Sequence, residues 1–501
     1  MKRLLVTYRI ALLLLALLVG SRTQAATASP EWVTDEIHVA IMDHLTLDGI
    51  AITPRAAALR LVANGTSWTL REGEPVRFER DGNDVVARFG NDRISASSMS
   101  LELDGPGAFD VDGGSSSYVR TYTGSLDIAG KSSGSGLSII NRVPIEDYVA
   151  SVVGAEYGLD DIEGAKAMAV VARTYALHAL STNKNLLDSE RSQVYKGLHK
   201  ATAAARLAAQ STAGEVLTWK GELIEAVYSA SNGGRTASNA SVWGTNAIPY
   251  LESRKDPFDA EVSPHASWSF EMDEEKMEKA LSSAFGLNVR SVRIQETARD
   301  GRVTQVELKG KNGSKTVSGS AFRASLARSF GAMTVKSTYF DLDEKRDRYV
   351  LNGHGFGHGV GLSQWGAHGM ARDGRTYDEI LDFYYKGVRL ESMPQRTSVS
   401  TRVLLAEETS TGTPAAIRSW SSGDSDAAQS DNLSISRPSS EVSSASLVTV
   451  SNASSTPKEK NRTTSTEAET EEALTAETIW GASREGSGSD KKKSRKRRSG
   501  W

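Results

Sequence analysis

An α+β protein is predicted by three features of this 501-residue sequence. Residues 31 to about 130 alternate short apolar stretches with Asn-Gly and Asp-Gly turns, which is typical of β-hairpins. Residues 143 to about 210 carry apolar side chains at helical spacing. Residues 264–345 mix both patterns. We therefore expect a β-rich N-terminal unit, a mixed helix and strand catalytic core with an inserted subdomain, and a disordered C-terminal tail.

The composition limits the class of protein. The 59 Lys and Arg residues and 62 Asp and Glu residues give a net charge of -3, so no global field favours nucleic acid as a partner. Hydrophobic residues make up 39% of the chain, which is enough for a sizeable core. The absence of cysteine excludes disulfides, thiolate metal sites and a cysteine nucleophile.

Export is predicted by the first residues. Met1-Lys2-Arg3 is a positive start, an apolar run follows from Ile10 to Gly20, and small and polar residues continue to Ala26. This order is typical of a secretory signal peptide over residues 1–26, with cleavage near Ala25. The run is short for a membrane span, although an uncleaved N-terminal anchor is the alternative. Either way the remainder is exported, with no membrane span after signal cleavage.

The elements are expected in the following order. The β-rich unit covers residues 31–117 and the core covers residues 118–392, with residues 264–345 as the inserted subdomain. Helices are expected at residues 143–157, 162–180, 200–210 and 273–285, and strands at 214–219, 223–228 and 303–309. Beyond residue 393 the chain is rich in Ser, Thr, Glu and Ala and ends in a basic block at 491–498, which predicts a disordered tail over 393–501. That block either contacts anionic wall polymer or lipid, or is simply solvated.

Glu156 is the first candidate for chemistry. It lies four residues after Val152, beside the apolar stripe of the predicted helix and in its last turn. Partial burial and the negative end of the helix dipole both disfavour a carboxylate, so we expect a raised pKa for Glu156, as a general acid requires. The alternative is a surface glutamate at a frayed helix end.

Arg173 is the second candidate. It lies among small and apolar residues of the next predicted helix, so its side chain is expected to be partly buried. A buried guanidinium needs an acidic or hydrogen-bonded partner, and Glu156 on the preceding helix is one available partner. The alternatives are a snorkelling arginine and a scaffold ion pair. Lys166, seven residues earlier, has the same alternatives.

A third candidate is the segment 228–236, in which a strand runs into Gly233-Gly234. Ser231, Asn232 and Arg235 flank the two glycines, so the loop can present several donors to a polar ligand. Most Gly-Gly turns are only turns, and no base for a serine nucleophile is adjacent in sequence.

A fourth candidate is the segment 352–367, where glycines alternate with His354, Phe356 and His358. Glycine at this spacing cannot hold a helix, and on a strand both histidines would point to one face. No cluster of further ligands is obvious, so metal binding is not favoured. Glycines beside His358, Gln364 and Trp365 suit the floor of a sugar-binding groove, and a tightly packed core strand is the alternative.

Six ordered stretches give this chain a specific resemblance. They are residues 122–126, 141–156, 165–176, 193–197, 233–236 and 355–367. Together they resemble the stage II sporulation protein D family, also called the amidase-enhancer family, over about residues 118 to 391.

The resemblance implies a lytic transglycosylase that acts on peptidoglycan glycan strands stripped of stem peptides. The family's catalytic glutamate falls on Glu156. It would protonate the bond between N-acetylmuramic acid and N-acetylglucosamine and then take the proton of the muramic acid's C6 hydroxyl, which gives a 1,6-anhydro end. Arg173 would orient Glu156 or bind substrate. The glycan groove would be lined by Ser231, Asn232, His358, Gln364 and Trp365.

Two alternatives remain. One is a noncatalytic wall-binding protein that activates an N-acetylmuramoyl-L-alanine amidase. The other, metal-dependent hydrolysis, is the weakest, because Ser229 and Asn232 stand where some relatives could supply His and Cys to a metal. We expect no metal and no cofactor; glycan strands and an amidase are the expected partners.

Overall fold

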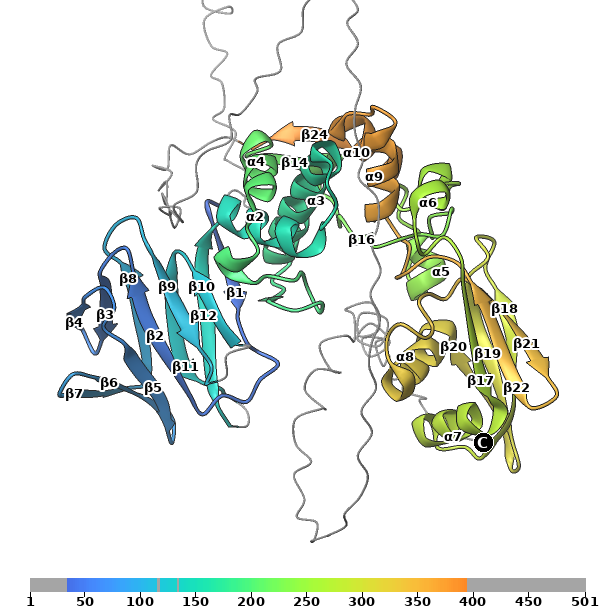
Figure 1. The fold of residues 1–501 in the computed structure, drawn as a ribbon, viewed down its shortest axis with the longest axis horizontal. Coiled ribbons are helices and arrows are strands. Elements are labelled where there is room, and N and C mark those ends of the chain that lie inside the picture. Colours follow the sequence, from blue (N-terminus) through green and yellow to red (C-terminus); the bar gives the residue numbers. More distant parts are fainter. Residues whose placement is uncertain (1–33, 115–117, 133–134, 394–501) are drawn as a thin grey trace, which may run out of the picture. The chain divides into compact units, whose positions relative to one another are not determined.

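The computed structural model describes residues 34–393 apart from residues 115–117 and 133–134 (Figure 1). The predicted signal peptide and the predicted tail from residue 394 onward lie outside the described residues. Helices and strands both run through the described part, so the α+β prediction is confirmed. In that part, no helix combines the length and the apolar character that crossing a membrane would require.

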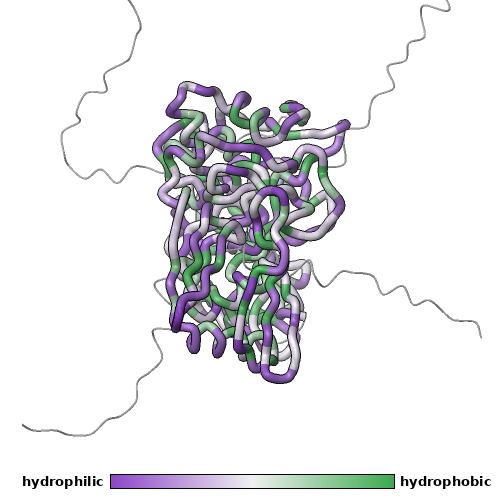
Figure 2. Tube along the Cα trace, turned by 90° about the vertical axis from the view of Figure 1, so that its right-hand side faces the viewer, coloured by the Kyte–Doolittle hydropathy of each residue, from purple (hydrophilic) through white to green (hydrophobic). Residues whose placement is uncertain are grey.

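The N-terminal region is built from β-strands. They are β1 (Glu36–Ala40), β2 (Gly49–Arg55), β3 (Leu59–Ala63), β4 (Thr66–Leu70), β5 (Val76–Asp81), β6 (Asp84–Phe89), β7 (Asp92–Ala96), β8 (Ser98–Leu103), β9 (Ala108–Asp112), β10 (Val119–Tyr122), β11 (Ser125–Gly130), β12 (Leu137–Pro144) and β13 (Leu186–Leu187). One sheet has the order β13-β1-β12-β11-β8-β3-β4 and the other β10-β9-β2-β5-β6-β7. Buried and more exposed residues alternate along β2 and β12, as expected where one sheet face covers a core. Figure 2 shows hydrophobic (green) and hydrophilic (purple) residues interspersed along the trace.

Two predicted hairpin turns are present. Asn64 and Gly65, with φ of 51° and 77°, connect β3 to β4, and Gly82, with φ of 63°, lies between β5 and β6. Glycine adopts this left-handed conformation at low cost and asparagine tolerates it. The turn residues therefore fix both connections.

The β-region extends past the boundary expected at residue 117. Strand β10 pairs with β9, β11 pairs with β8, and β12 pairs with both β11 and β1. The two sheets therefore continue to Pro144, where the helical part begins. The sequence suggested an earlier boundary because residues 118–144 already carry motifs of the resemblance.

The core continues with helices and short strands. They are α2 (Ile145–Glu156), α3 (Ile162–Ser181), the 3-10 helix η2 (Gly197–His199), α4 (Ala203–Ser211), β14 (Glu215–Trp219), β15 (Glu222–Leu223), β16 (Tyr228–Ser229), α5 (Asn239–Trp243), α6 (Pro257–Val262), β23 (Leu362–Ser363), α9 (Gln364–Arg372), α10 (Tyr377–Tyr384) and β24 (Arg389–Ser392). Helix α3 packs against α2, α4, α9, α10 and β14, which is why its small and apolar residues are buried on nearly every side. Its N-cap is Asp161, which accepts a hydrogen bond from the Gly164 N–H at 2.6 Å.

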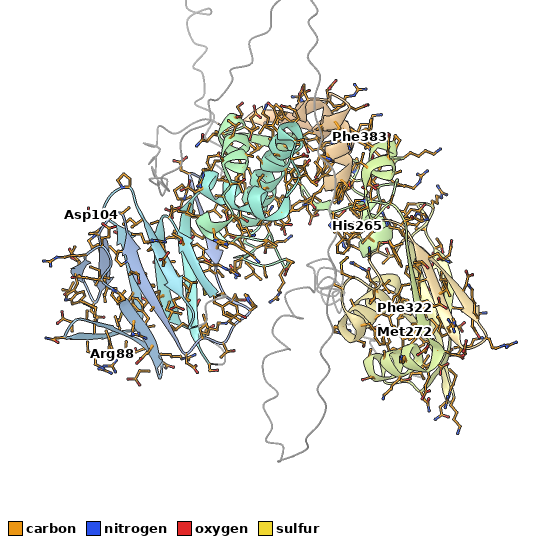
Figure 3. All side chains as sticks on the ribbon, viewed as in Figure 1. Arg88, Asp104, His265, Met272, Phe322 and Phe383 are labelled. Carbon is orange, nitrogen blue, oxygen red and sulfur yellow. The ribbon has the colours of Figure 1, made fainter. Side chains whose placement is uncertain are left out.

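Residues 268–353 form a separate group of elements. They are β17 (Trp268–Asp273), α7 (Glu274–Phe285), β18 (Val289–Thr297), β19 (Val303–Gly310), β20 (Gly313–Ser318), α8 (Gly319–Phe330), β21 (Phe340–Lys345) and β22 (Arg348–Gly353). The sheets β17-β22-β21 and β18-β19-β20 share a hydrophobic core with the two helices. Met272 and Phe322 belong to this core (Figure 3). It is distinct from the hydrophobic core that joins the β-region to α2, α3, α9 and α10.

The segment 300–302 ties this group to the core. The buried Arg302 guanidinium donates to the carbonyls of Asn232 and Arg235, both at 3.1 Å. Asp300 accepts the Ser241 hydroxyl hydrogen bond at 2.5 Å. A Cβ on Gly359, whose φ is +70°, would lie 2.0 Å from Arg302 Nη2, so a side chain at this position would displace the guanidinium.

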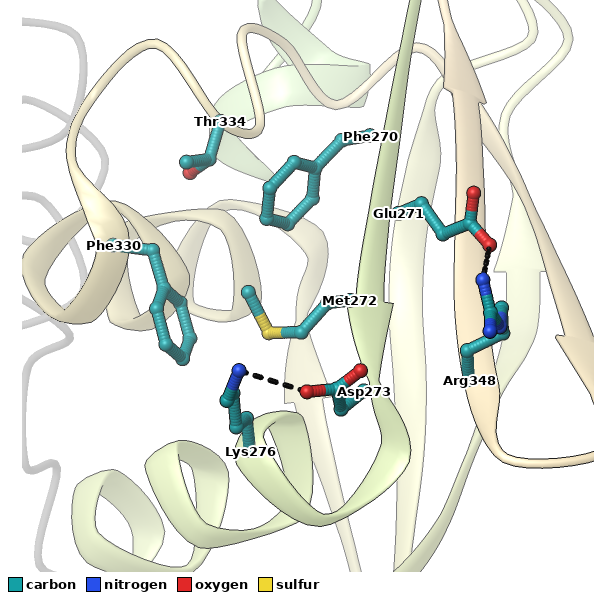
Figure 4. A pocket seen from close by; sticks show the side chains of 8 residues that line it. All are labelled: Phe270, Glu271, Met272, Asp273, Lys276, Phe330, Thr334 and Arg348. Carbon is teal, nitrogen blue, oxygen red and sulfur yellow. Dashed lines mark hydrogen bonds and ion pairs between the residues drawn. The ribbon is translucent and has the colours of Figure 1, made fainter.

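A cavity of about 510 Å³ lies in the same group (Figure 4). Phe270, Met272 and Phe330 form its apolar wall, and the Lys276–Asp273 and Arg348–Glu271 ion pairs lie beside them. The charged groups are thus paired with one another.

Candidate functional site

Glu156 is the last residue of α2 and its side chain is partly buried. The backbone N–H of Val194 donates to its carboxyl oxygen Oε1 at 2.8 Å. This hydrogen bond fixes the carboxyl against the segment 193–197, one of the six stretches of the resemblance. The prediction that Glu156 lies at a helix end beside buried residues agrees with this geometry.

Tyrosines and a glutamine surround this carboxyl. The buried Tyr148 hydroxyl donates to Gln193 Oε1 at 2.9 Å, and Gln193 Nε2 donates to the Tyr228 hydroxyl at 3.4 Å. Burial raises the pKa of Tyr148 well above its usual range, and Tyr175 and Glu156 raise it further. Burial and then Glu156 raise the pKa of Tyr228 in the same way. Both phenols are therefore neutral at physiological pH and can act as hydrogen-bond donors or acceptors.

Arg173 is not the partner of Glu156. Its side chain is fully buried, and Nε and Nη2 donate to the two carboxyl oxygens of Glu146 at 3.0 and 2.5 Å. Its remaining hydrogen bonds go to the carbonyls of Ala209 and Glu215 and to the Thr212 hydroxyl. Arg173 therefore joins α2 to α4 and β14, and the expectation that it orients Glu156 is corrected. The sequence indicated Glu156 as one available partner, and nothing in the spacing pointed to Glu146 in the first turn of the same helix.

Ser231 and Asn232 lie in a buried network centred on Asp256 and Asp259. Asp259 accepts hydrogen bonds from the hydroxyls of Ser231 and Ser363 at 2.9 and 2.6 Å, and from the backbone N–H groups of residues 232, 233 and 234 at 2.9–3.1 Å. Asp256 accepts from Asn232 Nδ2 at 2.6 Å and from the Tyr384 hydroxyl at 2.7 Å. Burial raises the pKa of Asp256, while these donors and the Asp259 N–H lower it. We call this set the aspartate network.

The aspartate network leaves little for a ligand to contact. The side chains of Ser231 and Asn232 are 1% and 0% exposed. Their donors and acceptors are directed at Asp256 and Asp259, so in this structure they hold the loop and do not face a groove. Sequence analysis missed both aspartates because they lie more than twenty residues after the loop that they bind.

The glycine-rich segment 354–361 is a loop and not a strand. Gly355, Gly357, Gly359 and Gly361 all have positive φ, between 70° and 114°. His358 Nδ1 accepts a hydrogen bond from the Val360 N–H at 3.0 Å, and its ring packs against Trp243 at 5.4 Å. Burial, with Arg302 and Arg323, lowers the pKa of His358 to about 3, so its imidazole is neutral.

Gln364 and Trp365 open helix α9 beside the strand that carries Tyr228. Tyr228 pairs with Leu362 in parallel, and the Trp365 N–H donates to the Ala230 carbonyl at 3.0 Å. Gln364 is buried and Trp365 is partly buried. The structure thus brings the 228–230 and 362–365 segments together, and Tyr228 links them to Glu156.

A second polar contact lies close to Glu156 along the chain. Asp161 Oδ2 accepts from the Tyr157 hydroxyl at 2.8 Å and lies 2.6 Å from His368 Nδ1. The His368 ring contacts Trp365 edge-on at 5.7 Å. The loop after Glu156 is therefore connected to α9 through Trp365.

Sequence reasoning missed the residues that surround Glu156. Tyr148, in the helix predicted over residues 143–157, and Tyr175, Gln193 and Tyr228 were given no role at the site. The available signal was that buried phenols need hydrogen-bond partners.

In the described part of the chain, no group of three or more His, Cys, Asp or Glu side chains is arranged to hold a metal ion.

Two family models match this chain, and one of them covers the residues around Glu156. A model described as stage II sporulation protein matches residues 133–219, which include Glu156, Tyr175 and Gln193. A second model, described as a domain of unknown function (DUF8618), matches residues 251–361. The first match ends at Trp219 and the second begins at Leu251, so the two matches do not overlap.

Individual relatives extend the match. An uncharacterized protein of Brachyspira hyodysenteriae is 32% identical over 259 residues, covering 50% of this chain and 67% of the relative. The amidase enhancer of Bacillus subtilis is 30% identical over 273 residues, covering 46% of this chain but only 38% of that protein. Stage II sporulation protein D of Bacillus subtilis is 31% identical over 277 residues, covering 50% of this chain and 75% of the relative. The chain therefore belongs to the stage II sporulation protein D family.

Proposed function

We propose that this protein is an exported lytic transglycosylase that cleaves peptidoglycan glycan strands between N-acetylmuramic acid and N-acetylglucosamine. The observation that carries the proposal is the setting of Glu156, whose partly buried carboxyl accepts the Val194 N–H among neutral phenols. The resemblance assigns the family's catalytic glutamate to the same residue. A protein acting on such strands belongs in the periplasm or cell wall.

In the first step, the protonated Glu156 carboxyl donates its proton to the glycosidic oxygen. The bond from that oxygen to the anomeric carbon breaks, and an oxocarbenium-like centre develops on the muramic acid. In the second step, the C6 hydroxyl of the same sugar attacks this centre and its proton passes to the Glu156 carboxylate. The product is a 1,6-anhydro ring, and Glu156 is protonated again.

The surrounding residues have roles that follow from their chemistry. The Val194 N–H keeps the Glu156 carboxyl in place at the end of α2. Tyr228 is a partly exposed residue whose hydroxyl is held by Gln193, and we assign it the binding of a sugar hydroxyl. Trp365, partly exposed at the start of α9, offers a ring face for a sugar. Neutral phenols are suited to this role because they add no charge that would favour a permanently ionised Glu156.

Glu156→Gln tests the proposal. The amide keeps the shape of the side chain but has no proton to donate, so we expect the yield of anhydro-ended products from denuded glycan to fall by roughly 10²–10⁴-fold. The products are measured by mass spectrometry. The matched control is Glu222→Gln, an exposed glutamate of β15, which should leave the yield unchanged. Full retention of anhydro ends by Glu156→Gln would disprove the mechanism.

A noncatalytic enhancer is the second candidate function. It is favoured by the 30% identity to the amidase enhancer of Bacillus subtilis. In that case an N-acetylmuramoyl-L-alanine amidase is the partner, the protein binds glycan without forming product, and Glu156→Gln leaves stimulation of the amidase unchanged. Glu156→Gln therefore distinguishes the two functions when it is measured both for anhydro-ended products and for stimulation of the amidase.

A further inference from the structure

Lys336 lies outside the proposed machinery, in the segment between helix α8 and strand β21. Its side chain is partly buried, and its Nζ lies 3.3 Å from His265 Nδ1. Among residues 34–393 that the structure describes, no carboxylate lies within ion-pair distance of this ammonium. A partly exposed ammonium without an acidic partner keeps its hydration, and it can exchange that water for the carboxylate of a ligand.

His265 cannot supply the missing charge. A lysine ammonium only donates hydrogen bonds, so His265 Nδ1 must be the acceptor and the ring must be neutral with its proton on Nε2. Burial, and then the Lys336 charge, lower the pKa of His265, which keeps it neutral. The charge of Asp259 acts in the opposite direction and raises the pKa of His265. The Asp259 oxygens, however, already accept the hydrogen bonds of the aspartate network. The pair therefore has a net positive charge and two unused donors on Nζ.

Aromatic rings lie beside this charge. Phe356 meets the His265 ring edge-on at 5.0 Å, and Tyr339 lies 5.0 Å from the His354 ring. Phe356 and Tyr339 are partly exposed and His354 is exposed, so these rings reach solvent. Such a combination of ring faces and one cation fits a ligand that has an apolar ring or chain and a single negative group.

The backbone holds Lys336 against the glycine-rich loop. The Gly357 N–H donates to the Lys336 carbonyl at 2.9 Å, and the Ser337 hydroxyl donates to the His354 carbonyl at 2.6 Å. Phe356 and Ser231 exchange two backbone hydrogen bonds, at 2.8 and 3.0 Å. Ser231 is three residues after Tyr228, which places their Cα atoms at most about 11 Å apart. The charge and its aromatic surroundings are thus joined by short connections to the residues around Glu156.

We propose that Lys336, His265 and Phe356 form a carboxylate-binding subsite for the ligand that Glu156 cleaves. This inference rests on the proposed function, because it takes the ligand to be a fragment of peptidoglycan. Two carboxylates of that polymer share the required chemistry: the lactyl carboxylate of muramic acid, which is free only where the stem peptide is absent, and the carboxylates of the stem peptide itself.

Binding to defined fragments tests the subsite. The full chain with Glu156→Gln, which does not consume ligand, is titrated with three probes by calorimetry: denuded glycan oligosaccharides, the same oligosaccharides with their carboxylates converted to methyl amides, and the free stem tetrapeptide. Adding Lys336→Met should weaken binding of a carboxylate-bearing probe roughly tenfold or more, since a hydrogen bond to a charged group is lost. Binding of the amide-capped glycan should not change. Lys336→Arg should restore most of the affinity.

Each outcome of this experiment is decisive. A loss confined to denuded glycan identifies the lactyl carboxylate, and a loss confined to the tetrapeptide identifies the stem peptide. Equal affinity of Lys336→Met and its parent for both carboxylate-bearing probes, or an equal loss on the amide-capped glycan, overturns the subsite. The matched control is Lys255→Met, an exposed lysine, with circular dichroism to confirm folding.

The subsite and the catalytic proposal can fail separately. Lys336-dependent binding, with no anhydro product formed by the protein that retains Glu156, would leave the subsite and remove the enzyme. Normal anhydro product with Lys336-independent binding would leave the enzyme and remove the subsite.

Discussion

Two groups of acidic side chains in one core differ in how their oxygens are used. Asp259 in the aspartate network is 0% exposed and accepts two hydroxyls and three backbone N–H groups. Glu156 is partly exposed at a helix end, fixed by the Val194 N–H and faced by neutral phenols. Each carboxyl is held in place, but only Glu156 retains a surface through which a substrate can approach.

A carboxyl that holds a loop in place differs from one that can exchange a proton with a ligand. A carboxylate whose lone pairs are all occupied cannot exchange a proton with a substrate, whereas it binds its donors strongly. Ser231 and Asn232, expected in the groove, belong to the first group because their polar atoms bind aspartates. Arg173 belongs there too, since Glu146 and three other acceptors use its donors.

The strongest way to break this comparison is Asp259→Asn. The amide keeps the volume but turns one acceptor oxygen into a donor that faces existing donors, so we expect the free energy of unfolding to fall by about 3–5 kcal/mol. Urea denaturation followed by circular dichroism measures the change. Glu156→Gln, compared under identical conditions, should change it by less than about 1 kcal/mol. A stable Asp259→Asn protein that binds glycan poorly would instead place Asp259 in the groove.

Arg173→Met tests the same division on a cation. The substitution replaces the guanidinium with an apolar side chain of similar length. It leaves Glu146, which is 29% exposed, and two carbonyls without their donor. We expect a loss of about 2–4 kcal/mol in stability, somewhat below the value for a fully buried pair. Below the new melting temperature, kcat/KM on denuded glycan should be nearly unchanged. An unchanged melting temperature with a large fall in kcat/KM would return Arg173 to the role that the sequence predicted.

His358→Gln sharpens the comparison through pH. The unfolded imidazole binds a proton below its ordinary pKa of 6.5, while the folded His358 stays neutral until about pH 3. Stability from this group is therefore complete above pH 6.5 and decreases as the pH falls toward 3, by at most about 1.4 kcal/mol per pH unit. The variant should lack this slope. Urea midpoints at pH 6.5, 5.5 and 4.5 measure it, and parallel lines for the two proteins would show that His358 is not buried in its neutral form.

Much of the fold follows from local patterns in the sequence. The Asn64-Gly65 turn, the helix that starts after Pro144 and the alanine-rich helix 162–181 are all local features, and the structure has each of them. The division between the two sheets was not predictable in this way. It depends on β12 pairing with β1, a contact across about a hundred residues that no local pattern encodes.

The candidate site was predictable only where one residue type carried the signal. Glu156 was predicted because its carboxyl lies at a helix end beside an apolar stripe, whereas the pairing of Arg173 with Glu146 depends on packing that the sequence does not show. Lys336 was missed because its proposed role depends on which side chains the fold places around its ammonium, and the sequence does not show that. For the glycine-rich segment, the alternative of a core strand is excluded, because alternating positive φ values cannot form a strand.

The continuation of both sheets through β10, β11 and β12 has a practical consequence for expressing parts of this protein. A fragment cloned to begin at residue 118 would remove β9 from β10, β8 from β11 and β1 from β12. The backbone groups left without partners would be open to pairing with other molecules, which favours aggregation. Soluble expression of the Glu156 region therefore calls for a start upstream of β1, with the whole β-region retained.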